Sequence, residues 1–190
     1  MKIYYSKKID KEIHKELNRM GEKLSPVFGH KFPKVKFDGQ MSIIASKVAK
    51  SMPDFNDGEI KRNMKKIFGK EMPEFFVVLN TIPFSTWNVE EKWISISLKD
   101  ILTFKRTLYH EANHFMYDYT FGTKKYEDTE IKETITVLNN SFKGVKDNDI
   151  GWKKFKEQRH KVWEHYSKKH ELRSSVEFAQ KLFKKSDRDC

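Results

Sequence analysis

The first seventy residues show helical periodicity, interrupted by one loop. Residues 2–5 predict a short strand. The apolar positions that follow recur every three or four residues, as on one face of a helix: Ile9, Ile13, Leu17, Met20 and Leu24. Two Pro and two Gly in the next stretch predict a loop, with room for a strand over 33–37. Helices are expected over 41–51 and 57–68, and Gly69 is a typical residue to end the second.

The middle of the chain changes to the periodicity of strands. The segment 74–79 is rich in β-branched and aromatic residues, and the segment 92–98 alternates between Ile or Leu and other residues. Pro83 lies between them and indicates that the connecting part is an edge strand or a loop, because proline cannot donate a ladder hydrogen bond.

The rest of the chain predicts helices. One runs over 100–119 and ends at Gly122, and further helices are expected over 127–142, 152–169 and 174–185. Ser174 and Glu177 have the spacing of a capping box at the start of the last helix. We therefore expect an α+β fold with an N-terminal α/β lobe over 1–122 and a C-terminal helical lobe over 123–190, packed as one compact unit.

Composition excludes several classes of protein. The chain has 190 residues, of which 37% are hydrophobic, so it predicts a globular protein rather than a disordered one. Cys190 is the single cysteine, which excludes an internal disulfide and a zinc site made of cysteines. A net charge of +11 predicts weak, nonspecific attraction to polyanions. The absence of a secretory leader or long apolar run leads us to expect a soluble cytoplasmic protein without membrane contact.

The candidate chemistry lies in the stretch His-Glu-Ala-Asn-His, residues 110–114. On a helix, His110 and His114 lie one turn apart on the same face, where both imidazoles could bind one metal ion. Glu111 lies beside that face and could take a proton from a water molecule that zinc activates. The competing interpretation is a pair of structural histidines on a buried helix, which would need hydrogen-bond partners of their own.

A catalytic zinc site needs a third protein ligand and one open position. The stretch lacks the continuation with a third histidine that is typical of metzincins, because Thr120 occupies the position six residues after His114. A carboxylate from a later helix is therefore expected as third ligand, and the candidates are Glu127, Glu130 and Glu133.

Spacing and helix face favour different glutamates. Eighteen residues separate His114 from Glu133, and this H-E-x-x-H-x18-E pattern resembles the gluzincin metallopeptidases, among them the thermolysin-like enzymes and the leukotriene-hydrolase type of aminopeptidase. The resemblance implies that Glu133 is the third ligand. Glu133 lies opposite the apolar stripe of its predicted helix, however, and Glu130 lies nearer to that stripe, so Glu130 stays as the alternative ligand. Val137 replaces the Asp that thermolysin-like enzymes carry four residues after this Glu, so another group must orient the histidine.

The stretch 85–88, Ser-Thr-Trp-Asn, resembles the edge strand of thermolysin-like enzymes that pairs with extended substrate. This resemblance implies that Ser85, Thr86 and Trp87 bind a peptide. The alternative is that Trp87 anchors a hairpin loop. Peptidases of this class also use a Tyr or His donor for the oxyanion, and the candidates are His165 and Tyr166, with His160, His170 and Tyr126 as further options.

Together these features predict a gluzincin-like zinc metallopeptidase. The resemblance covers about residues 75–142 and implies a zincin-like fold, with a small twisted sheet whose edge strand lies over an active-site helix. The expected cofactor is Zn²⁺ and the expected partner is a peptide or protein substrate. The alternative is a basic interaction or nucleic-acid-binding module in which zinc is structural or vestigial, with scattered Lys and Trp residues as the binding groups.

Overall fold

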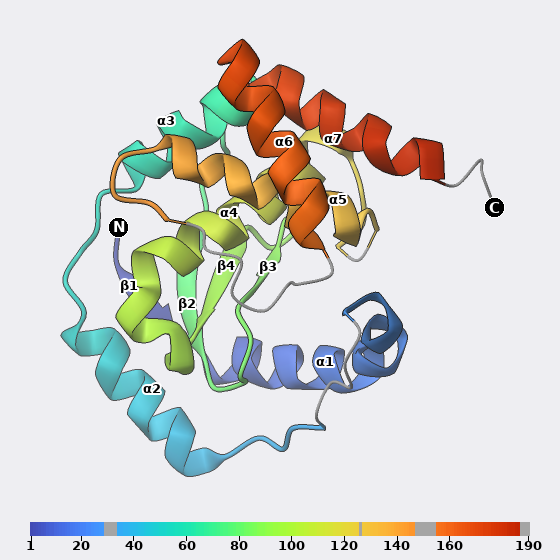
Figure 1. Cartoon of the computed structure of the whole chain (residues 1–190). Helices are drawn as coiled ribbons and strands as arrows, with labels where there is room; N and C mark the ends of the chain where they lie inside the picture. The colour runs from blue at the N-terminus through green and yellow to red at the C-terminus, as the bar shows by residue number, and fades with distance from the viewer. Residues whose placement is uncertain (29–33, 126, 147–154, 187–190) are drawn as a thin grey trace. The chain divides into compact units, whose positions relative to one another are not determined.

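The structure is a computed structural model that describes residues 1–28, 34–125, 127–146 and 155–186 (Figure 1). Its internal contacts divide the chain into two units. The sheet unit comprises Met1–Asp57 and Pro73–Glu111, and the helical unit comprises Gly58–Met72 and Ala112–Cys190. The division between Glu111 and Ala112 falls inside one long helix, and the expected lobes over 1–122 and 123–190 stay a prediction.

The sheet unit contains a four-stranded mixed sheet in the order β1-β2-β4-β3. Its strands are β1 (Ile3–Tyr5), β2 (Phe76–Asn80), β3 (Thr86–Asn88) and β4 (Trp93–Ser97). The strands β1, β2 and β4 run parallel to one another, and β3 pairs antiparallel with β4, with Trp87 opposite Ile94. The strands expected near 2–5, 74–79 and 92–98 are confirmed. All five residues of β4 are buried, so both faces of this strand are covered.

Two helices accompany the sheet, α1 (Lys7–Phe28) and α2 (Gly39–Ser51). Ile13 and Leu17 of α1 pack with Val78 and Trp93 in one apolar cluster. The prediction of a strand over 33–37 is wrong for the residues that the structure describes, because residues 34–38 have no regular secondary structure. The side-chain amide of Asn18 bonds both the N–H and the C=O of Val35, which occupies the groups that a partner strand would use.

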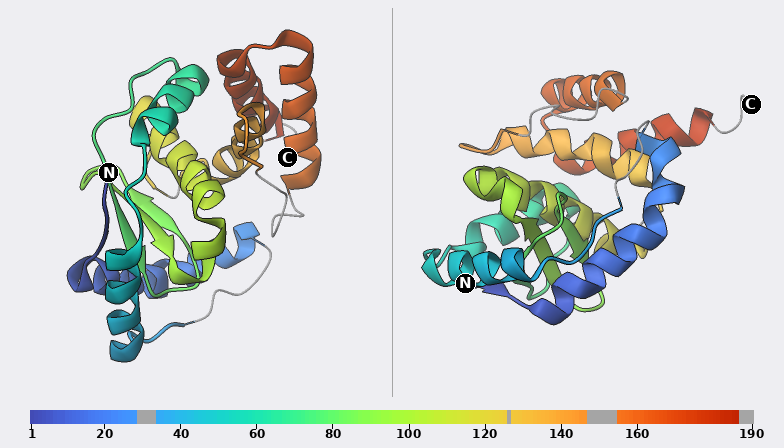
Figure 2. Two further views of the ribbon diagram at one scale, coloured as in Figure 1. Left: turned by 90° about the vertical axis from the view of Figure 1, so that its left-hand side faces the viewer. Right: turned by 90° about the horizontal axis from the view of Figure 1, so that it is seen from below.

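The helical unit is built from α3 (Asp57–Phe68), the second half of α4 (Phe104–Phe121), and three further helical segments. These segments are α5 (Thr129–Ile135) with the 3-10 helix η2 (Thr136–Ser141), α6 (Lys156–Lys169) and α7 (Leu172–Ser186). The last two pack side by side (Figure 2). Gly69 and Gly122 both have φ +68 and end α3 and α4 in the left-handed conformation that glycine tolerates.

Three expected helix boundaries are corrected. Residues 98–103 form the separate 3-10 helix η1 (Leu98–Thr103) before α4, and the helix expected over 127–142 divides into α5 and η2. The helix α7 begins at Leu172, so Ser174 lies inside it and does not cap it. The mixed α+β class and a C-terminal part made of helices are confirmed. None of the helices within the described residues is both long and apolar enough to cross a membrane.

Candidate metal centre

Helix α4 carries both histidines of the motif. It is continuous through His110 and His114, so the helix itself fixes these residues one turn apart on one face. His114 is 1% exposed and Glu111 is 6% exposed, whereas His110 is half-buried. The helix is apolar around them, since Leu108, Phe115 and Met116 are buried. The predicted helical placement of the motif is therefore confirmed.

Helix α5 brings Glu133 to the histidines. The ligand atoms that His110, His114 and Glu133 can offer all lie within 4.8 Å of one another. Glu130 is half-buried in the first turn of α5 and is not part of this group. The structure thus places together the three residues that the gluzincin spacing selected.

The apolar stripe argues against Glu133 only if one side of the helix faces solvent. In the structure, every residue from 131 to 139 is buried. Lys132, Glu133 and Thr134 are as enclosed as Ile131 and Ile135. The apolar periodicity therefore carried no information about which side of α5 faces the histidines.

The distance between His114 and Glu133 fits ligands of a shared ion. Nε2 of His114 lies 3.4 Å from Oε1 of Glu133. Two donors held about 2.0–2.2 Å from a tetrahedral zinc ion lie roughly 3.3–3.6 Å apart. A direct N–H···O hydrogen bond is shorter, about 2.7–3.2 Å. Two imidazoles and one carboxylate are also a donor set that suits zinc, so the residues present fit a metal ion in their chemistry and in this one distance.

Two buried cations hold the segment that carries Glu133. Lys132 Nζ pairs with Asp118 of α4 at 2.5 Å and also donates to the carbonyls of Lys124 and Lys125. Burial lowers the pKa of Lys132, and the neighbouring Asp118 opposes this shift. From α6, Arg159 donates through Nη1 to the carbonyl oxygen of Glu133 at 2.7 Å.

Arg159 donates a second hydrogen bond from Nη1, to Oγ1 of Thr136. We refer to the contacts of Lys132 and Arg159 together as the clamp. Neither Lys132 nor Arg159 belongs to a motif that the sequence shows. Both belong to strongly charged stretches whose usual location is a solvated helix face, so the sequence carried no signal for their burial.

Strand β3 contains two of the three residues expected to bind substrate. Thr86 and Trp87 lie in β3, at the edge of the sheet as the sequence predicted. Ser85 precedes the strand, and its hydroxyl has a structural role. It accepts a hydrogen bond from the backbone N–H of Ser97 at 3.0 Å and donates to Asp100 at 3.1 Å. Peptide binding by these residues stays a prediction.

The two leading candidate oxyanion donors, His165 and Tyr166, lie on α6. Nδ1 of His165 lies 3.2 Å from Oγ of Ser175, and its ring stacks on Phe178 of α7 with centroids 4.5 Å apart. Tyr166 contacts the rings of Trp163 and His170. These contacts explain how both side chains are held, and their catalytic role stays a prediction.

The other three candidate donors divide by position. His160 is exposed and lies 3.2 Å from Glu164. His170 is exposed and caps the end of α6. Tyr126 lies outside the described residues.

Comparison with protein-family models, with curated proteins and with solved structures found no match to this chain. What the arrangement can do follows from its chemistry. A buried group of two imidazoles and one carboxylate could hold a metal ion. Glu111 directly follows His110 on α4 and adds a second carboxylate.

Proposed function

We propose that this chain is a zinc-dependent metallopeptidase of the gluzincin type with a zincin-like fold. The observation that carries the proposal is the group formed by His110, His114 and Glu133, whose ligand atoms lie within 4.8 Å of one another. Its members come from a helix and from a segment nineteen positions further along the chain, in the order that the gluzincin pattern requires.

The donor set supports a catalytic rather than a structural ion. Structural zinc sites are closed by four protein ligands and are usually rich in cysteine, whereas catalytic sites use three protein ligands and keep one position open. Three ligands are grouped here among the described residues, and none is a cysteine. A bound zinc ion would supply Lewis acidity and an activated water to such a site.

Glu111 is the proposed general base. It follows His110 directly, so on α4 its carboxylate lies about 100° around the helix axis from that ligand. It would accept the proton of the attacking water and pass it to the leaving amine. Glu111 is 6% exposed, so bulk solvent has little access to this carboxylate.

The edge position of β3 supports a peptide as substrate. An edge strand presents one row of backbone groups to an incoming chain, and an extended peptide can add to it through main-chain hydrogen bonds. Thr86 and Trp87 would lie along such a peptide, which gives the proposal its substrate class.

The proposal is tested with the purified full chain loaded with zinc, using fluorescein-labelled casein and a pool of random-sequence peptides followed by mass spectrometry. Glu111→Gln is expected to keep one equivalent of zinc and to lose hydrolysis by about 10²- to 10⁴-fold, because glutamine cannot accept the proton. Glu164→Gln removes an exposed carboxylate from α6 and is the matched control, with hydrolysis expected at the wild-type level.

Two outcomes would overturn the proposal. Retained hydrolysis in Glu111→Gln would exclude Glu111 as the base. A wild-type chain that holds one zinc ion but cleaves neither probe would favour the alternative, a basic interaction module in which zinc is structural or vestigial.

A further inference from the structure

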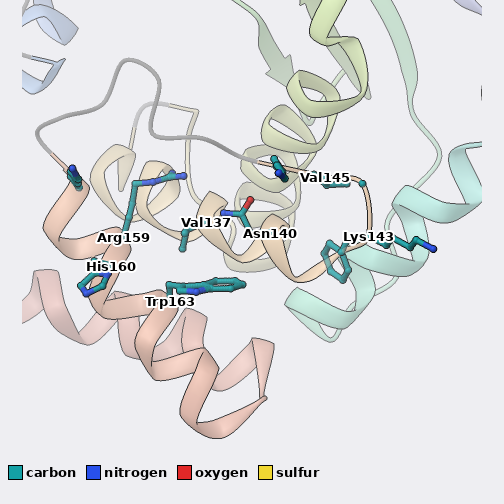
Figure 3. Close-up of a pocket in the computed structure, with 11 residues that line it drawn as sticks. Val137, Asn140, Lys143, Val145, Arg159, His160 and Trp163 are labelled. Carbon is teal, nitrogen blue, oxygen red and sulfur yellow. The ribbon is translucent and has the colours of Figure 1, made fainter.

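The helical unit contains a pocket of about 840 Å³ that the metal group does not use. Its lining comes from η2, from the segment that follows it, and from α6. Figure 3 shows Val137 and Asn140 of η2 facing Trp163 of α6. The volume lies within the range of about 300–1,000 Å³ that is typical of sites for small molecules.

The charged residues that line the pocket are all basic. Lys146 and Lys156 contribute ammonium groups and Arg159 contributes a guanidinium, whereas the side chain of Lys143 points away from Trp163 (Figure 3). No Asp or Glu is among the described lining residues. His160 also lines the pocket, but its Nε2 faces the carboxylate of Glu164 at 3.2 Å, so we do not count it among the groups that would bind an anion. A concave surface of one sign concentrates its field, so the pocket attracts anions more strongly than the scattered lysines elsewhere do.

The remaining walls are apolar and include one aromatic ring. Val137 and Val145 are buried, and Phe142 and Trp163 are half-buried. The indole of Trp163 is held from the side by Tyr166, with ring centroids 5.3 Å apart. An inorganic anion would leave these walls without a partner. A ligand that combines an anionic group with a planar ring would use both the lysines and the indole.

Arg159 gives the pocket one rigid wall. It is 2% exposed, and Nη1 is fixed by the carbonyl of Glu133 and the hydroxyl of Thr136. The long side chains of the lysines must lose rotamer freedom when they bind a ligand, whereas this guanidinium is already ordered.

We propose that this pocket binds a nucleotide unit, with the phosphate held by Lys146 and Lys156 and the base stacked on Trp163. The site does not depend on the proposed peptidase activity. The same chemistry is offered by a free nucleotide and by the end of a nucleic-acid strand, and the pocket of about 840 Å³ has the size of a small-molecule site, which favours the free nucleotide.

The experiment is isothermal titration calorimetry of the full chain at physiological salt with four probes. These are adenosine 5′-monophosphate, adenosine, inorganic phosphate and a single-stranded ten-nucleotide oligoadenylate. The monophosphate is expected to bind at one site, and adenosine and phosphate are each expected to bind at least about tenfold more weakly, because each lacks one of the two contacts.

Variants then locate the binding site. Lys146→Glu combined with Lys156→Glu is expected to weaken monophosphate binding by at least about tenfold, through repulsion of the phosphate. Lys168→Glu combined with Lys169→Glu makes the same change in net charge at exposed positions of α6 outside the lining. This control is expected to change the affinity by less than about twofold, since distant charges are screened at this salt.

Trp163→Leu tests the stacking contact, with circular dichroism to show that the helices are retained. The expected result is a loss of affinity of about tenfold or more for the monophosphate and an unchanged, weak affinity for phosphate. Equal losses in both lysine pairs would overturn the proposal and leave only nonspecific attraction to a basic protein. Phosphate binding as tightly as the monophosphate, or oligoadenylate binding without monophosphate binding, would also overturn it.

Discussion

Lys132 and Asp118 form a buried ion pair, with Nζ 2.5 Å from Oδ1. Lys132 is the residue directly before Glu133 in the sequence. Their side chains are 1% and 3% exposed. Asp118 lies on α4 one turn after His114, and Lys132 immediately precedes Glu133, so the pair joins the two segments that carry these candidate ligands. Removing one member of such a pair leaves the other charge buried without compensation, which costs more than the pair itself contributes.

Asp118→Asn is therefore expected to lower the free energy of unfolding by about 3 kcal/mol, measured by urea denaturation of the metal-free chain. Lys132 keeps its bonds to two carbonyls, which places the loss at the low end for a broken buried pair. Asp118→Leu combined with Lys132→Met should recover much of the loss. Glu157→Gln, which breaks an exposed pair with Lys161, should leave the transition unchanged. A small effect of Asp118→Asn alone would contradict the clamp.

The identity of the third ligand is tested by two alanine variants. Glu133→Ala is expected to weaken zinc binding by more than about 100-fold, beyond the 10- to 100-fold that is typical for loss of an outer partner, because a coordinating oxygen is removed. Glu130→Ala is the matched control on the same helix, and its zinc affinity should stay at the wild-type value. Competition with a chromophoric chelator measures both. Severe loss in Glu130→Ala with retention in Glu133→Ala would refute the assignment.

Ser85 is expected to act through the sheet rather than through substrate. Ser85→Ala leaves the backbone N–H of Ser97 without its acceptor, so the free energy of unfolding should fall by about 1–3 kcal/mol. Ser51→Ala removes an exposed hydroxyl that donates to Val48 and should have a smaller effect. Thermal and urea denaturation measure both. Unchanged stability in Ser85→Ala would contradict the structural role.

Tyr5 predicts a pH dependence of stability in the alkaline range. Burial raises the pKa of its hydroxyl from 10.0 to about 12, with Ser42 and Asp10 as hydrogen-bond partners. Between these two values the unfolded chain loses this proton and the folded chain keeps it, so stability falls as the pH rises.

Tyr5→Phe lacks this proton, so its free energy of unfolding should fall less steeply than that of the wild type above pH 10. Urea denaturation of both proteins between pH 9 and pH 11 measures the difference, with Tyr4→Phe, an exposed tyrosine, as the control. Parallel curves for the wild type and Tyr5→Phe would contradict the raised pKa.

The sequence was informative where local chemistry determines structure. Alternation in 92–98 and the positive-φ positions of Gly69 and Gly122 follow from the residues themselves, and so does the one-turn spacing of His110 and His114. The choice between Glu130 and Glu133 did not follow from local pattern. It depends on which elements cover α5, and a helix covered on every side no longer shows its orientation in its apolar periodicity.

Tertiary contacts also explain what the sequence could not reveal. The coil around Val35 depends on the distant Asn18, and the burial of Arg159 depends on acceptors 26 and 23 residues earlier in the chain. The basic pocket combines residues from η2, the following segment and α6, none of which forms a recognisable motif in one dimension. Residue types indicated which groups could bind a metal ion, and tertiary packing decided which of those residues lie together.

The short chain separation between His114 and Glu133 has a consequence for folding kinetics. Only eighteen residues lie between them, and a loop of this length closes with a small entropic cost and on a timescale far below that of folding a whole domain. The contact between α4 and α5 is therefore expected to form early, before the sheet has gathered strands β1 and β2 from opposite ends of the first eighty residues. An ion that joins these helices would then bind the transition state for folding as well as the native state. Zinc present during refolding should accelerate folding, and zinc added afterwards should change the unfolding rate comparatively little.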